Sequence, residues 1–87
     1  MLLAMPTKKK TLRMHFSANL RAARKRSGMS QEALANLADL HRTYIGQVEN
    51  AGRNISIDSI EKLVKALDID PAELMSGWHV VPKNKAH

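Results

Sequence analysis

Apolar residues recur at intervals of three and four along most of this chain, which is the period of an amphipathic α-helix. In the first such stretch, residues 11–27, the stripe includes Phe16, Leu20 and Ala23. Gly28 follows it and is a natural stop, because glycine accepts the left-handed conformation that ends many helices. The pattern therefore predicts a first helix at about 11–27.

Two short helices follow, with a tight break between them. Ser30 is a good N-cap, since its hydroxyl accepts a hydrogen bond from a free backbone N–H in the first helical turn. The predicted helices are residues 31–38 and 42–50, and the break is residues 39–41. In the second helix Ile45 and Val48 face inward. Gly46 falls on its outward face, where the absence of a side chain permits close approach.

The fourth predicted helix begins after Ser56 and has the widest apolar face in the chain. A fifth, short helix begins at Asp70, with Pro71 at its first position and Glu73 closing a capping box. We therefore expect a compact all-α domain of five helices at residues 11–77. A flexible basic arm precedes it at 1–10, and a tail follows at 78–87 that forms a short strand or a hydrophobic latch.

Composition agrees with helices packed on helices. Only 3% of the 87 residues are aromatic, so Leu, Ile, Val, Ala and Met must build the core, and this mix favours packed helices over a β-sandwich, which would contain more Tyr, Phe and Thr. The net charge of +6 is unevenly distributed. Residues 1–26 contain eight Lys or Arg and no acid, whereas residues 56–75 are acidic on balance. A polarised field of this kind suits an anionic polymer on one side and a different partner on the other.

Several classes of function are excluded by what the chain lacks. There are no cysteines, so thiolate metal sites and disulfides are excluded, and a reducing cytoplasm is the expected location. The four histidines have no metal-site spacing, and no Ser, His and Asp residues are placed as a nucleophile with its base. No apolar run is long enough to span a membrane, and the apolar start at 1–5 does not read as a signal peptide. We expect no enzyme activity, cofactor, metal, membrane or small-molecule ligand.

The paired helices at 31–38 and 42–50 have the lengths of a helix-turn-helix. In that motif the first helix crosses the DNA backbone and the second lies in the major groove. The second helix must therefore be apolar where it docks on its own domain and polar where it meets base edges. Residues 42–50 satisfy both requirements.

The amino-acid sequence of this region resembles the Xre family of phage and bacterial repressors, to which Cro belongs. The resemblance rests on four runs and covers about residues 12–75: Met29-Ser30-Gln31-Glu32-Ala33-Leu34-Ala35, Arg42-Thr43-Tyr44-Ile45, Val48-Glu49 and Arg53-Asn54-Ile55-Ser56-Ile57. Within the family, Arg42 to Ile45 and Arg53-Asn54 look most like the controller proteins of restriction–modification systems. The resemblance implies a lambda-repressor-like fold.

The resemblance also implies roles for individual residues. Three would contact bases (Arg42, Thr43 and Gln47), and four would contact phosphates (Gln31, Tyr44, Arg53 and Asn54). Glu49 would be structural, tying the end of its helix to Arg21 or Arg24. The family often has glycine where this chain has Asp39 and Ala51, and at the second position Asn50 or Gly52 is expected to take the strained conformation instead.

The fourth and fifth helices are expected to form a homodimer interface, because their apolar residues exceed what one small core encloses. These residues are Ile57, Ile60, Leu63, Val64, Leu67, Leu74 and Met75. The predicted function is a dimeric transcriptional regulator that binds double-stranded DNA at a pseudo-palindromic operator and controls its own gene. Three alternatives stay open: a DNA-binding antitoxin, a protein-interaction module without DNA, and an RNA-binding protein.

Overall fold

The computed structural model describes residues 11–80, and within this range every regular element is an α-helix. The predicted basic arm at 1–10 and the end of the tail, 81–87, lie outside the described residues. Residues 78–80 form no strand. The all-α prediction is confirmed, and the helices are α1 (Leu12–Arg26), α2 (Gln31–Ala38), α3 (Arg42–Glu49), α4 (Ile57–Leu67) and α5 (Ala72–Met75).

Three helices begin at a hydroxyl N-cap. The Thr11 side chain accepts a hydrogen bond from the Met14 N–H at 3.1 Å, and Ser30 and Ser56 cap α2 and α4 in the same way. Only one of the two hydrogen bonds of the capping box predicted for α5 is present, and the prediction of the other is wrong. The Asp70 carboxylate accepts from the Ala72 N–H at 2.8 Å, but the Glu73 carboxylate pairs with Arg26 of α1 instead of its own helix.

Left-handed residues end or follow the first four helices. Gly28 has a φ of 74°, as expected, but the other three positions are Asp39, Ala51 and Asp68, with φ of 58°, 59° and 56°. The prediction that Asn50 or Gly52 replaces Ala51 in this role is therefore wrong. Ala51 adopts the strained conformation itself, because its N–H bonds to the Val48 carbonyl and the chain must reverse there to leave α3.

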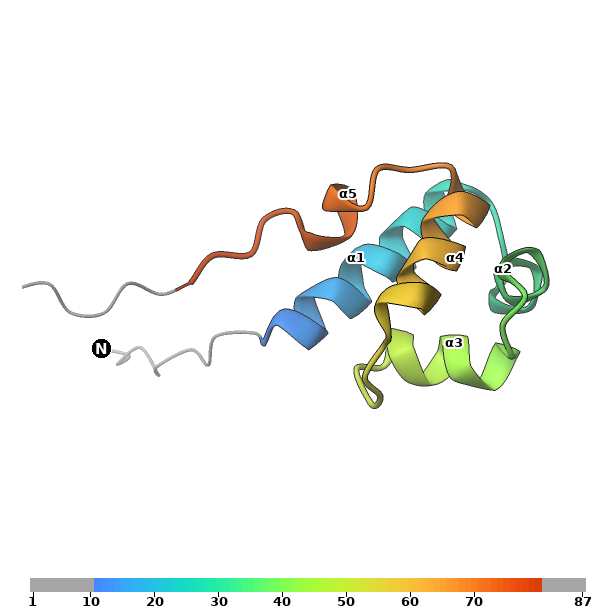
Figure 1. Ribbon diagram of the computed structural model, residues 1–87, viewed down its shortest axis with the longest axis horizontal. Helices are drawn as coiled ribbons and strands as arrows, with labels where there is room; N and C mark the ends of the chain where they lie inside the picture. Colours follow the sequence, from blue (N-terminus) through green and yellow to red (C-terminus); the bar gives the residue numbers. More distant parts are fainter. Residues whose placement is uncertain (1–10, 81–87) are drawn as a thin grey trace, which may run out of the picture.

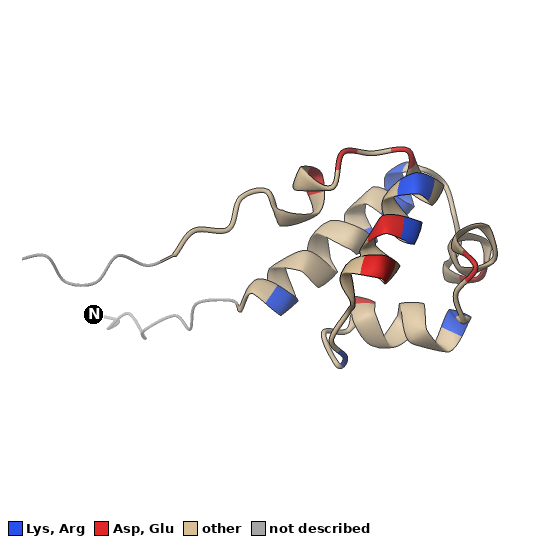
Figure 2. Cartoon of the chain, viewed as in Figure 1, with Lys and Arg blue, Asp and Glu red and all other residues tan. Residues whose placement is uncertain are grey.

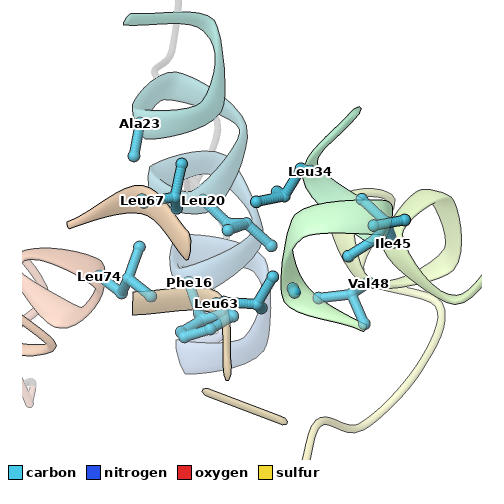
Figure 3. Close-up of a cluster of buried hydrophobic side chains, with 11 residues drawn as sticks. Phe16, Leu20, Ala23, Leu34, Ile45, Val48, Leu63, Leu67 and Leu74 are labelled. Atoms are coloured by element: carbon cyan, nitrogen blue, oxygen red, sulfur yellow. The ribbon is translucent and has the colours of Figure 1, made fainter. Parts of the chain in front are cut away.

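The core gathers side chains from all five helices, as Figure 3 shows. Its buried members are Phe16, Leu20, Ala23, Leu34, Ala35, Ala38, Ile45, Val48, Leu63, Leu67 and Leu74. This corrects the predicted dimer interface at Leu63, Leu67 and Leu74, which are 0%, 6% and 0% exposed within one protomer. Because they are buried, these side chains cannot contact a partner. The apolar stripe of α4 is wide, so one side of it packs in the core and the other side lies at the surface.

The arrangement leaves α3 along one edge of the helical cluster, away from α5 (Figure 1). Helix α2 contacts α3 and α4, and α1 contacts α3 and α5. Helix α5 is held in place by the burial of Leu74 and by polar contacts with α1. The Asn19 amide donates to the carbonyl oxygens of Leu74 at 2.9 Å and Ser76 at 3.1 Å, and the His15 ring lies against the Ser76 carbonyl.

Candidate nucleic-acid interface

A tight left-handed turn sets the angle between α2 and α3. Asp39 ends α2 in the left-handed conformation, and the next N–H, of Leu40, donates to the Ala35 carbonyl at 2.9 Å. This pair of features is a Schellman-type helix end, in which the residue after the turn packs back on the helix. Leu40 does pack against the core. Asparagine and aspartate tolerate this conformation better than most residues, so Asp39 replaces the usual glycine.

Helix α3 has the two faces that a groove-binding helix needs. Ile45 and Val48 are 0% and 1% exposed and anchor the helix to the core. Arg42, Thr43 and Gln47 are all exposed, so the three predicted base-contacting side chains lie on the side of α3 that is open to solvent. An eight-residue helix is about 12 Å long at 1.5 Å per residue, which suits a single entry into the major groove.

Gln31, at the start of α2, spans the gap to α3. Its amide nitrogen donates to Glu49 Oε1 at 3.1 Å, and its side chain lies over Gly46, where an added Cβ would stand 3.5 Å from the Gln31 amide oxygen. The Gln31 side chain therefore packs against Gly46 at ordinary contact distance. The second hydrogen of the Gln31 amide stays available for a phosphate oxygen.

A buried ion pair ties the end of α3 to α1. Arg24 donates to both oxygens of Glu49, from Nε at 2.6 Å and from a terminal nitrogen at 2.9 Å, and its other terminal nitrogen donates to the Met29 carbonyl at 2.8 Å. The two side chains are only 9% and 1% exposed. Of the two predicted partners of Glu49, Arg24 is correct and Arg21, which is exposed, is wrong.

This pair also fixes the charge state of Arg24. Hydrogen bonding to Glu49 raises the pKa of the Arg24 guanidinium above its ordinary value, against the opposing effect of burial. A raised folded-state pKa contributes stability that is complete below the unfolded-state pKa and is lost only as pH rises through the higher value. Because that range is strongly alkaline, Arg24 holds its proton throughout the neutral range.

Ser17 makes a contact with α3 that was not predicted from the sequence. It is buried on α1, and its hydroxyl hydrogen bonds to the Val48 carbonyl in the last turn of α3. It lies on the buried stripe with Leu20 and Arg24, three and seven positions further along the helix. A small polar residue on an apolar stripe was the available signal, since buried hydroxyls require a partner.

Two of the remaining predicted phosphate contacts, Tyr44 and Arg53, lie together beside the exposed face of α3. Arg53, in the loop after α3, places its guanidinium carbon 5.2 Å from the centre of the Tyr44 ring. The same guanidinium donates to the Gln47 side-chain oxygen at 2.9 Å. Tyr44 is half-buried, while Arg53 and Asn54 are exposed. The structure thus brings Tyr44, Gln47 and Arg53 into direct contact, which sequence spacing did not predict.

Charge differs between α3 and α4. Figure 2 shows basic residues at the beginning of α1, at the beginning of α3 and in the loop after α3, and both basic and acidic residues on α4. The basic positions near α3 are Arg42 and Arg53, whereas on α4 the charges of Asp58 and Glu61 are balanced by two lysines. The edge formed by α3 is therefore the better surface for a polyanion.

A second exposed surface is apolar and lies between α4 and α5. Ile57 is 77% exposed and Met75 is 39% exposed, and the half-buried Ile60 and Val64 lie between them. Together with Pro71 and Ala72 they line a shallow groove of about 390 Å³. We call this surface the α4–α5 patch. Isolated surface apolar residues are common in monomers, but a contiguous patch marks an interaction site.

Two other kinds of site find no support in the described part of the chain. Residues 11–80 hold no cluster of three or more His, Asp or Glu side chains that would suit a metal ion. No helix in the same range has the length and apolar character needed to cross a membrane.

Comparison with known proteins places this arrangement in a family. Residues 20–74 match the family described as helix-turn-helix, a segment that includes α2, α3, α4 and nearly all of α5. The chain therefore belongs to the helix-turn-helix family of DNA-binding transcriptional regulators, and it is of the Xre type.

Several of its relatives are control proteins. The chain is 48% identical over 65 residues to the control protein C.BamHI of Bacillus amyloliquefaciens, a match covering 74% of this chain and 80% of that protein. It is 41% identical over 61 residues to the control protein C.SmaI of Serratia marcescens, covering 70% and 73%. The crystal structure of the restriction–modification controller protein C.AhdI from Aeromonas hydrophila superposes with a TM-score of 0.70 at 48% identity, covering 71% of this chain and 94% of that one.

Proposed function

We propose that this protein is a controller of a restriction–modification system that binds a pseudo-palindromic operator as a symmetric dimer and regulates its own gene. The observation that carries the proposal is the division of α3 into a buried face, Ile45 and Val48, and an exposed polar face, Arg42, Thr43 and Gln47. The identity to control proteins over about three-quarters of the chain supports the restriction–modification role.

In this proposal α3 enters the major groove and α2 crosses the backbone beside it. Arg42 and Thr43, in the first turn of α3, meet base edges. Gln31, Tyr44 and Asn54 bind phosphates, which fix the register of the helix without reading sequence. Gln31 has the clearest means of doing so, since one amide hydrogen is held by Glu49 and the other is free.

The dimer in this proposal forms through the α4–α5 patch. The partner's copy of the same patch would cover Ile57, Ile60, Val64 and Met75, as a two-fold axis requires. These four are the members of the predicted interface that remain accessible in the protomer. A symmetric dimer presents two copies of α3, and half-sites on one face of DNA lie about 34 Å apart.

Footprinting on the DNA upstream of its own gene tests the proposal. The expected result is protection of two inverted half-sites centred one helical turn apart, at protein concentrations where unrelated DNA stays unprotected. Uniform protection of all DNA would show binding without an operator. Protection of a single half-site by a protein that sediments as a monomer would contradict the symmetric dimer.

A further inference from the structure

A hollow of about 690 Å³ lies between the beginning of α1, the loop after α3 and the beginning of α4, and we call it the α1–α4 groove. Its size is within the range of ligand-binding clefts. Phe16 and Val48 of the core reach it from below, and Ile55 and Ile60 line it half-buried. Four of the six large apolar side chains that residues 11–80 expose also line it: Leu12, Met14, Ile57 and Met75. Apolar exposure on this scale at one place marks an interaction site.

The charges around the α1–α4 groove narrow the choice of occupant. Arg13 and Arg53 line it, and no Asp or Glu of residues 11–80 does so. A basic segment would therefore be repelled, and its ammonium groups would find no partner. The groove suits an occupant that is apolar and carries no excess of cationic side chains.

The sequence supplies such a segment close by. Residues 1–5 are Met-Leu-Leu-Ala-Met, a wholly apolar run that no part of the proposed DNA-binding surface uses. Methionine and leucine suit a groove of irregular shape, because methionine in particular adapts to gaps that a rigid side chain leaves open. The lysines of this end of the chain are confined to residues 8–10, outside the apolar run.

The connection between this run and the groove is short. Thr11 and Leu12, the first described residues, already line the groove. Only residues 6–10 separate them from the apolar run, and five residues span at most about 17 Å when fully extended. A tether of this length gives the run an effective concentration on the order of millimolar at its own groove. A free partner would have to compete with that concentration.

We propose that residues 1–5 dock in the α1–α4 groove of their own protomer and cover its apolar lining. Ile57, Ile60 and Met75 line both this groove and the α4–α5 patch, so the docked segment borders the proposed dimer interface. The inference goes beyond the proposed function and does not depend on it, because it concerns a surface away from the exposed face of α3.

Cross-linking tests the location, and the absence of native cysteines makes the result unambiguous. Leu3→Cys would be combined with Ile57→Cys, at the groove, or with Ala18→Cys as the control. Ala18 is exposed, lines a different hollow and lies seven positions after Thr11, about 10 Å along α1, so the tether reaches it too. Under mild oxidation the disulfide within one chain should form about tenfold faster, or more, with Ile57→Cys, because docking holds the two thiols close together.

Thermal melts test the energetic contribution with substitutions that leave the described residues unchanged. Leu2→Ser with Leu3→Ser should lower the Tm by about 4–8 °C, the shift expected in a domain of this size when a modest apolar contact is lost. Lys9→Ser with Lys10→Ser alters the same end of the chain outside the docked run and should leave the Tm unchanged. The difference should not vary with protein concentration, since the contact lies within one protomer.

Three results would overturn the docking. Equal rates of disulfide formation with Ile57→Cys and Ala18→Cys would show that residues 1–5 have no preferred position. Disulfides mainly between chains, at a rate that rises with protein concentration, would assign the groove to a second copy. Equal Tm values for the two double-serine variants would show that the apolar run makes no stabilising contact. None of these measurements uses DNA, so none of these results bears on the proposed function.

Discussion

Arg42 begins the helix proposed to enter the groove, and its side chain is exposed beside Thr43. A guanidinium can donate two parallel hydrogen bonds to guanine O6 and N7, which an ammonium group cannot reproduce because it lacks the planar fork. The first turn of such a helix reaches furthest into the groove. We therefore expect Arg42 to read one guanine in each half-site.

Arg42→Ala should abolish preference at that guanine, a loss of about 1–3 kcal/mol in discrimination, while weak salt-sensitive binding persists. Arg42→Lys should keep the charge and recover only part of the preference. The measurement is competition among operators changed one position at a time, at constant salt. If Arg42→Ala weakens all operators equally, Arg42 contacts only the backbone.

The Arg24–Glu49 pair ties the end of α3 to α1. Glu49→Ala leaves the buried Arg24 charge without its partner, which should lower the free energy of unfolding by about 3–5 kcal/mol. The exposed Arg26–Glu73 pair is the control, and Glu73→Ala should cost about 0–1 kcal/mol. Urea denaturation of the two variants gives both values. Equal losses would mean that burial of the first pair adds nothing to its effect.

At the scale of elements, the loop after α3 contains a strained backbone conformation. Ala51 holds a left-handed φ of 59° without a polar side chain to compensate, which costs an L-residue about 1–2 kcal/mol. Gly52, beside it, does not adopt that conformation, and an added Cβ would meet the Gln47 carbonyl oxygen at an ordinary 3.6 Å. The strain in this loop is therefore at Ala51.

Ala51→Gly should raise the free energy of unfolding by about 0.5–1 kcal/mol, the relief of strain less the added freedom of the unfolded chain. Gly52→Ala is the matched control, and it should leave stability unchanged or slightly higher. Thermal melts of the two variants distinguish these effects. A costly Gly52→Ala beside a neutral Ala51→Gly would move the strain to Gly52.

Periodicity and capping residues were enough to predict the helices. The bounds of α2 agree with the prediction, those of α1 differ by one residue at each end, and α3 ends one residue earlier than predicted. Periodicity identifies an apolar stripe but not the surface that covers it, so Leu63, Leu67 and Leu74 were assigned to a partner instead of the core. Side-chain contacts between elements, such as Arg53 with Gln47, depend on loop geometry that spacing does not encode.

At the scale of the whole molecule, the α4–α5 patch and α3 occupy different parts of the surface. Ile57 is the most exposed large apolar residue of the patch and lies at the first position of α4. A carboxylate is favourable near a helix N-terminus, so Ile57→Glu should not destabilise the protomer. It does place a charge within the proposed interface.

Ile57→Glu should therefore yield a folded monomer at tens of micromolar, with operator affinity reduced because two half-sites no longer bind together. Sedimentation velocity measures the oligomeric state. Leu37→Glu is the control, since Leu37 is 62% exposed but belongs to α2, and it should remain dimeric. Monomers from Leu37→Glu and dimers from Ile57→Glu would place the interface on α2.

The Arg24–Glu49 pair has a further consequence for the energetics of association. An isolated helix of eight residues is too short to persist in water. Because Arg24, Ser17 and Gln31 hold α3 on the domain, its ordering occurs when the protomer folds and is not repeated when DNA arrives. The heat-capacity change on binding should then reflect only the surface covered by DNA, without the larger negative contribution that accompanies folding coupled to binding.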